Sequence, residues 1–86
     1  MNEDHTNTAE ITAAIREILA LHGRMTITDV QDDHDLYAAG LTSLATVGIM
    51  LALEDRFNVE FPEKMLSRAT FRSIASIADA VTELAG

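Results

Sequence analysis

The chain has 86 residues, which is enough for one domain with a small hydrophobic core. It contains no cysteine, so disulfides, thiolate metal ligands and a cysteine nucleophile are excluded. The formal net charge is -8, and all the excess of acidic residues lies before Arg56. Such a surface repels nucleic-acid phosphates and either attracts basic partners or simply keeps the domain soluble.

The N-terminal residues give no sign of a membrane or export signal. No apolar run reaches the roughly 18 residues that suggest a membrane span, and residues 1–6 lack the basic and apolar regions of a signal peptide. We therefore expect a flexible N-terminus over residues 1–6, a single domain over residues 7–86, no membrane contact, and a monomeric cytoplasmic protein.

A first helix is predicted over Thr8–His22. Asn7 followed three residues later by Glu10 is a variant of the capping box, and apolar residues then recur at helical spacing. Gly23 is suited to the C-terminal stop. This helix contributes to a core, and none of its side chains suggests chemistry.

A long connection follows over residues 23–42. Such a length would ordinarily argue against the helix assignment, but four apolar residues are spaced to hold it on the domain: Met25, Ile27, Val30 and Leu36. Asp29, Gln31 and Asp33 resemble the start of a calcium loop, yet the required glycine and terminal glutamate are missing. No dedicated metal site is predicted, although the clustered aspartates leave loose binding of divalent ions open.

A second helix is predicted over Ser43–Phe57, with Thr42 as a helix cap. A serine at this place has its hydroxyl at a helix N-terminus, where free backbone N–H groups and the helix dipole favour a phosphate. Spacing predicts that one stripe of this helix is buried: Thr46, Val47, Met50, Leu53 and Phe57.

Two further helices are predicted near the C-terminus. Pro62 suits the first turn of a short helix over residues 63–66, and Thr70 is suited to cap a longer one that runs from Phe71 to Leu84. No strand pattern or repeat is present. The expected fold is all-α: a small four-helix bundle with three longer helices, one short helix and a long connection between the first two.

The run Gly40-Leu41-Thr42-Ser43-Leu44, within residues 35–62, resembles the G-x-D-S-L motif of phosphopantetheine-binding carrier proteins. The order and spacing of the helices extend the resemblance over residues 7–84. It implies that Ser43 carries a 4'-phosphopantetheine arm, which a phosphopantetheinyl transferase attaches from coenzyme A. Thr42 replaces the aspartate of the motif, so the resemblance leaves open which transferase acts.

The resemblance also implies a partner-binding surface on the second helix, made of Thr42, Leu44, Ala45, Gly48 and Leu51. Fatty-acid carriers usually hold carboxylates at the positions of Ala45 and Gly48. Their absence indicates apolar docking, unless Gly48 reflects neutral drift at an exposed site. The pattern looks more like the stand-alone aminoacyl carrier proteins, which implies a small amino-acid cargo such as glycine or alanine. It also implies a ligase that resembles the core of a class II aminoacyl-tRNA synthetase.

The same residues give little support to other functions. A serine hydrolase needs a G-x-S-x-G turn between a strand and a helix, with a histidine and an acid beside the serine. No strand is predicted, and His5, His22 and His34 lie in the tail, at a helix end and in the acidic connection. We therefore predict a carrier protein without catalytic activity. A fatty-acyl or polyketide carrier and an unmodified helical interaction module remain the alternatives.

Overall fold

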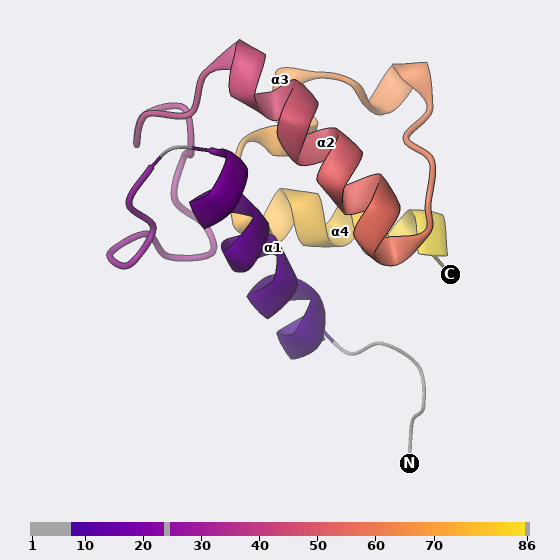
Figure 1. Cartoon of the computed structure of the whole chain (residues 1–86), viewed down its shortest axis with the longest axis horizontal. Coiled ribbons are helices and arrows are strands. Elements are labelled where there is room, and N and C mark those ends of the chain that lie inside the picture. Colours follow the sequence, from indigo (N-terminus) through magenta and orange to yellow (C-terminus); the bar gives the residue numbers. More distant parts are fainter. Residues whose placement is uncertain (1–7, 24, 86) are drawn as a thin grey trace.

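A computed structural model describes residues 8–23 and 25–85, and within them it contains helices but no strand. The longer helices are α1 (Thr8–His22), α2 (Ser43–Phe57) and α4 (Ile74–Ala85) (Figure 1). Between α2 and α4 lie a short 3-10 helix, Glu63–Met65, and the four-residue helix α3 (Arg68–Phe71). The predicted all-α bundle of three longer helices and one short helix is confirmed.

The predicted bounds of the first two helices are also confirmed. At the end of α1, the Gly23 N–H donates to the Leu19 carbonyl at 2.8 Å. A Cβ at this position would lie 2.7 Å from the same oxygen, so glycine is required for the stop. The predicted cap Asn7 and the predicted flexible tail, residues 1–6, lie outside the described residues.

The predicted start of the last helix is wrong. The short helix predicted over residues 63–66 is a 3-10 helix, Glu63–Met65, and Thr70 lies inside the separate helix α3 rather than capping α4. Ser73, the residue before α4, caps this helix instead, because its Oγ accepts the Ser76 N–H at 3.0 Å. The Ser76 hydroxyl in turn donates to the Thr70 carbonyl at 2.9 Å, which fixes the break between the two helices.

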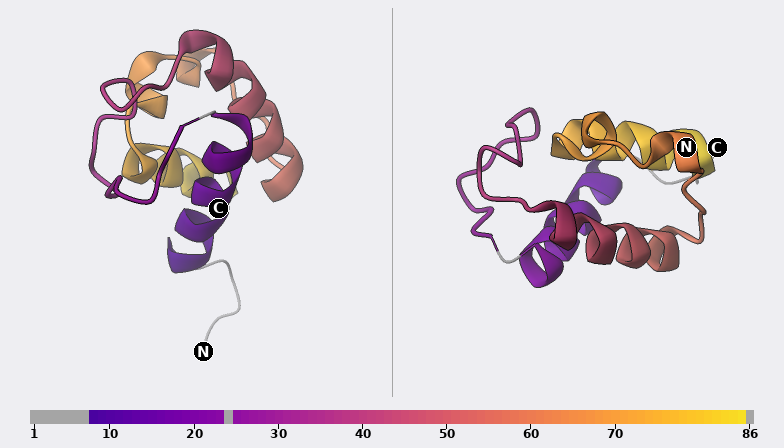
Figure 2. Two further views of the ribbon diagram at one scale, coloured as in Figure 1. Left: turned by 60° about the vertical axis from the view of Figure 1, so that its left-hand side comes forward. Right: turned by 90° about the horizontal axis from the view of Figure 1, so that it is seen from above.

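The core is built from one face of each longer helix, and α1 packs against both α2 and α4 (Figures 1 and 2). Each fully buried aliphatic side chain contributes about 1.5–3 kcal/mol. The largest of them, including one from the connection, are Ile15, Leu19, Leu36, Ile49, Leu53, Ile74, Ile77 and Val81. Within the described residues, no helix is long and apolar enough to cross a membrane.

The predicted buried stripe of α2 is rotated from the observed one. Leu53 is buried as predicted, but the other buried residue of α2 is Ile49, and Val47 is 53% exposed. Met50 and Phe57 are only partly buried against the core. Almost every residue from Leu44 to Leu53 is apolar or small, so the sequence pattern does not fix which side of this helix faces inward.

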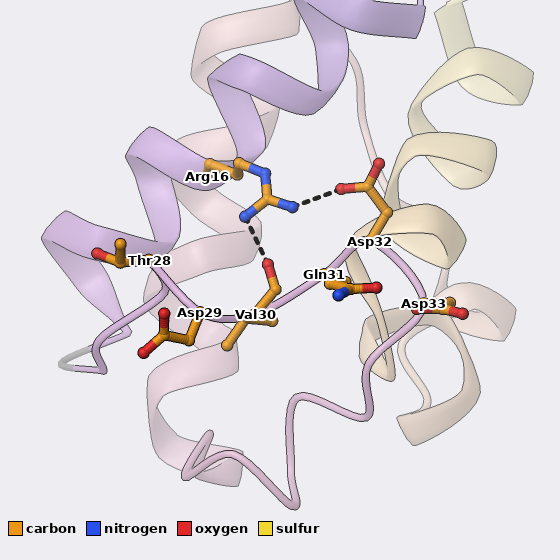
Figure 3. Close-up of a pocket in the computed structure, with 7 residues that line it drawn as sticks. All are labelled: Arg16, Thr28, Asp29, Val30, Gln31, Asp32 and Asp33. Atoms are coloured by element: carbon orange, nitrogen blue, oxygen red, sulfur yellow. Dashed lines mark hydrogen bonds and ion pairs between the residues drawn. The ribbon is translucent and has the colours of Figure 1, made fainter.

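The long connection is held by hydrogen bonds to both α1 and α4. Arg16 on α1 donates from Nη1 to the Val30 carbonyl at 2.7 Å and pairs through Nη2 with Asp32 at 2.6 Å (Figure 3). The Asp32 carbonyl accepts the Ala75 N–H of α4 at 2.8 Å. Val30 and Leu36 are buried, and Met25 and Ile27 pack against the core, as the sequence predicts. The end of the connection, which leads into Ser43, is therefore held in a fixed place.

Candidate functional site

The turn that leads into α2 is locked by local contacts. The Asp35 carboxylate accepts the Tyr37 N–H at 2.9 Å, and the Leu41 N–H donates to the Leu36 carbonyl at 2.9 Å. Both leucines are buried. Gly40 has a φ of 120°, which a residue with a Cβ rarely adopts, so this glycine is needed to direct the chain into the helix.

Ser43 is the first residue of α2 and is exposed. Thr42 before it is extended, and its hydroxyl oxygen accepts the Ala45 N–H at 3.1 Å, so threonine performs the predicted capping role. No hydrogen bond engages the Ser43 hydroxyl among the described residues, and the first turn of α2 contains no acid. The hydroxyl is therefore accessible, and the helix end favours an anion attached to it.

Ser43 also lines a groove of about 300 Å³ that is mostly apolar. We call it the Ser43 groove. Its lining comes from the turn, α2, α3 and the segment before α3: Tyr37, Ser43, Thr46, Val47, Met50, Leu66, Ser67, Arg68 and Phe71.

The charged member of this groove is Arg68. Its guanidinium carbon lies 4.0 Å from the centroid of the Tyr37 ring, a cation–π contact. Burial raises the pKa of the Tyr37 hydroxyl; the positive charge of Arg68 acts in the opposite direction, and the Asp35 carboxylate adds to the rise. The Ser43 groove thus contains a cation, Arg68, in direct electrostatic contact with one of its two aromatic rings, that of Tyr37.

The predicted partner residues are only partly brought onto one surface. Leu44 is 84% exposed and Leu51 is 55% exposed, and Thr42 is exposed beside Ser43. A Cβ built on Gly48 would meet no atom within 4 Å, so this position faces open space. Ala45 is partly buried and packs against the core, so less of its surface is open to a partner. Val47 is exposed where an inward position was expected, and we call Leu44, Val47, Gly48 and Leu51 the open face.

The sequence did not predict that Tyr37 and Arg68 line the same groove as Ser43. Tyr37 belongs to the run that resembles carrier proteins, but nothing in that run points to Arg68. Arg68 reaches the groove because the 3-10 turn Glu63–Met65 and α3 fold back beside α2, a tertiary effect. No pattern of charge or spacing in the sequence would have revealed this pair.

The other candidate chemistries find no support in the described residues. A larger, open pocket of about 690 Å³ is lined by Arg16 and residues 28–33, but Arg16 is already engaged by Val30 and Asp32 (Figure 3). No group of three or more metal-ligating side chains is assembled in the described part of the chain. The His34 Nδ1 accepts the Gln31 N–H at 3.1 Å, and neither His34 nor His22 lines the Ser43 groove.

Comparison with known proteins agrees with the resemblance to phosphopantetheine-binding carrier proteins. Residues 9–81 match the family described as "Phosphopantetheine attachment site". The chain is 47% identical to the aminoacyl carrier protein of Agrobacterium fabrum, over 83% of this chain and 88% of that protein. It is 34% identical to the D-alanyl carrier protein of Streptococcus gordonii, over 79% of this chain and 90% of the relative.

A solved structure is similar as well. It is described as an engineered Bradyrhizobium japonicum glycine:[carrier protein] ligase complexed with a carrier protein from Agrobacterium tumefaciens and ATP. One chain of it is 48% identical and superimposes with a TM-score of 0.79, covering 85% of this chain and 97% of that chain. An exposed serine hydroxyl at a helix end without acids, beside an arginine, fits the phosphodiester of 4'-phosphopantetheine. The chain belongs to the phosphopantetheine-binding carrier proteins.

Proposed function

We propose that Ser43 is the attachment site of the 4'-phosphopantetheine arm, and that the arm holds a small amino acid as a thioester. The observation that carries this proposal is the place of Ser43: it is the first residue of α2, exposed, with no partner for its hydroxyl among the described residues. The aspartate of the usual motif is replaced by Thr42, which still caps the helix.

The attachment chemistry belongs to a phosphopantetheinyl transferase. The Ser43 oxygen attacks the pyrophosphate phosphorus of coenzyme A that bears the pantetheine, and the nucleotide part of coenzyme A leaves with the other phosphate. A base on the transferase takes the serine proton. When bound, the group supplies a flexible arm that ends in a thiol, which this cysteine-free chain cannot provide.

The proposed cargo is glycine or alanine, loaded by an amino acid:carrier protein ligase. Support comes from the names of the relatives: one is an aminoacyl carrier, another a D-alanyl carrier, and the similar structure contains a glycine:[carrier protein] ligase. The open face agrees with this, because its side chains are apolar and Gly48 stands at one of the two positions, with Ala45, where fatty-acid carriers usually hold carboxylates. A ligase would approach it mainly through apolar contact.

The attachment site is tested by intact-mass analysis. The apo protein is incubated with coenzyme A and phosphopantetheinyl transferases of broad specificity, in parallel with Ser43→Ala and Ser67→Ala. Ser67 is the matched control because it is an exposed serine of the same groove. We expect the parent and Ser67→Ala to gain one arm and Ser43→Ala to gain none. An arm on Ser43→Ala, or an unmodified parent with every transferase, refutes the site and leaves the unmodified interaction module.

The cargo is tested on the holo protein. It is incubated with ATP, glycine or alanine and an amino acid:carrier protein ligase, and in parallel with fatty-acid synthase enzymes. We expect the mass of one amino acid on the arm, which hydroxylamine removes as it cleaves a thioester. Efficient acyl elongation by the fatty-acid enzymes, together with no amino-acid loading, would instead support the fatty-acyl or polyketide carrier.

Three further predictions accompany this proposal. The chain is expected to be a monomer, to work in the cytoplasm and to form one domain over residues 7–86. Light scattering of the holo protein checks the first, and cell fractionation checks the second. Limited proteolysis checks the third, since cleavage should be confined to residues 1–6.

A further inference from the structure

Within residues 8–23 and 25–85, Arg68 pairs with no carboxylate. The other arginines of the described residues all face an acid: Arg16 pairs with Asp32 at 2.6 Å, Arg56 with Glu17 at 3.2 Å and Arg72 with Asp35 at 3.9 Å. Arg68 has only its cation–π contact with Tyr37, although acids outnumber bases in the chain by 14 to 6. A chain this acidic could readily have supplied a carboxylate, so the absence of one leaves a cation available to an external anion.

The position of Arg68 indicates which anion is within its reach. Arg68 and Ser43 line the same groove of about 300 Å³, and no other charged side chain of the described residues lines it. The first turn of α2 offers no acid that would compete for the arginine. A guanidinium binds phosphate through a planar set of N–H donors, and such charge-assisted hydrogen bonds are about twice as strong as neutral ones.

We propose that Arg68 is a positioning residue that binds the phosphodiester joining Ser43 to its arm, and so directs the start of the arm along the Ser43 groove. The inference rests on the proposed function, because it requires the arm to be on Ser43. In the apo protein, Arg68 is held ready over the Tyr37 ring. In the holo protein, the phosphodiester neutralises the guanidinium beside that ring.

Tyr37 gives a direct readout of this exchange. It is the sole tyrosine of a chain without tryptophan, so its phenolate absorbance can be titrated without interference. The charged groups acting on it are Arg68 from α3 and Asp35 from the turn; the α2 residues of the groove are uncharged. In the apo protein, the positive charge of Arg68 favours the Tyr37 phenolate and so lowers the pKa of Tyr37. Once a phosphodiester neutralises Arg68, that help is lost and the pKa of Tyr37 should rise further.

The experiment compares apo and holo forms of the parent, Arg68→Gln and Arg56→Gln, after intact mass has shown complete conversion of each. Arg56→Gln is the matched control, since it removes an arginine that pairs with Glu17 and lies outside the groove. We expect the pKa of Tyr37 to rise on conversion in the parent and in Arg56→Gln. In Arg68→Gln, the apo value should already be higher than in the parent, and conversion should raise it by less.

Two outcomes of the titration overturn the proposal: no rise in the parent, or an equal rise in the parent and Arg68→Gln. A parent that takes no arm at all would instead refute the proposed function, which the mass measurement shows beforehand.

A second measurement requires the holo form of the parent protein only. The side-chain Nε–H resonance of Arg68, assigned by its loss in apo Arg68→Gln, should shift when the parent is converted, while that of Arg56 stays in place. An unmoved Arg68 resonance in a fully converted protein also overturns the proposal.

Discussion

The two ends of α2 have different roles. Its start carries Ser43 and the open face, with no acid in the first turn, and a Cβ at Gly48 would meet no other described part of the chain within 4 Å. Its end is tied into the fold. The Glu54 carboxylate accepts the Phe61 N–H at 2.8 Å, and Asn58, with φ 55°, closes the helix with its N–H on the Glu54 carbonyl.

A single helix thus serves folding at one end and recognition at the other. The end of α2 satisfies its polar groups within the chain, so changes there should alter stability. The start leaves apolar side chains and a serine hydroxyl without partners in the described residues, so changes there should alter what the protein binds. Substitutions at the two ends of α2 should therefore affect stability and binding separately.

The largest effect is expected on the open face, from Gly48→Glu combined with Leu51→Asp. Two carboxylates in an apolar interface would be buried without partners, and each such group costs more than 1 kcal/mol. Loading of the amino acid by the ligase should fall by about tenfold or more. The measurement is the initial rate of loading of the holo protein at limiting carrier concentration.

The matched control is Leu21→Asp, the same type of change at an exposed leucine on α1. It should load normally. Normal loading of the doubly substituted protein would contradict the aminoacyl docking surface and leave only the assignment to the carrier family.

A smaller effect is expected from Glu54→Ala, at the end of α2. The substitution leaves the partly buried Phe61 N–H without its carboxylate acceptor, which should cost about 1–3 kcal/mol of unfolding free energy. Urea denaturation followed by circular dichroism measures the loss. Arm attachment at Ser43 should be unchanged at temperatures where the variant is folded. The exposed neighbour Asp55→Ala is the control and should cost little; equal losses from both would show that the Phe61 contact adds nothing.

Gly48→Ala tests stability and ligase binding at a single residue. Alanine favours a helix interior by about 1 kcal/mol over glycine, and the structure has room for the methyl group, so stability should increase by about that amount. If a ligase brings its backbone close to this position, loading should become slower while the protein becomes more stable. A more stable variant that loads as fast as the parent would favour neutral drift at Gly48.

The smallest effect concerns Tyr37 and pH. Burial raises the pKa of Tyr37 above its ordinary value of 10.0, so the folded protein holds this proton more tightly than the unfolded chain does. Its contribution is fully present below about pH 10 and is lost as the pH rises through the folded pKa. The free energy of unfolding of the parent should therefore fall more steeply above pH 10 than that of Tyr37→Phe. Parallel curves for the two proteins would contradict this.

Some of the site was predictable because the signals are local. The turn glycine Gly40, the cap Thr42 and the serine Ser43 depend on neighbouring residues only, and helix bounds such as Thr8–His22 follow from apolar spacing and a glycine stop. The start of α4 was missed for a local reason too: both Thr70 and Ser73 can act as a cap, and the hydrogen bonds of Ser76 favour Ser73.

By itself, then, the sequence determined the all-α class, the carrier motif and the serine at the start of α2, since these depend on short-range chemistry. Tertiary structure alone decided the rotation of α2, because a helix apolar on nearly all sides is oriented only by what packs against it; Ile49 turned inward and Val47 outward. It also decided that Arg68 lies in the groove with Ser43. That pairing depends on how α3 folds back beside α2, and no spacing within either segment encodes it.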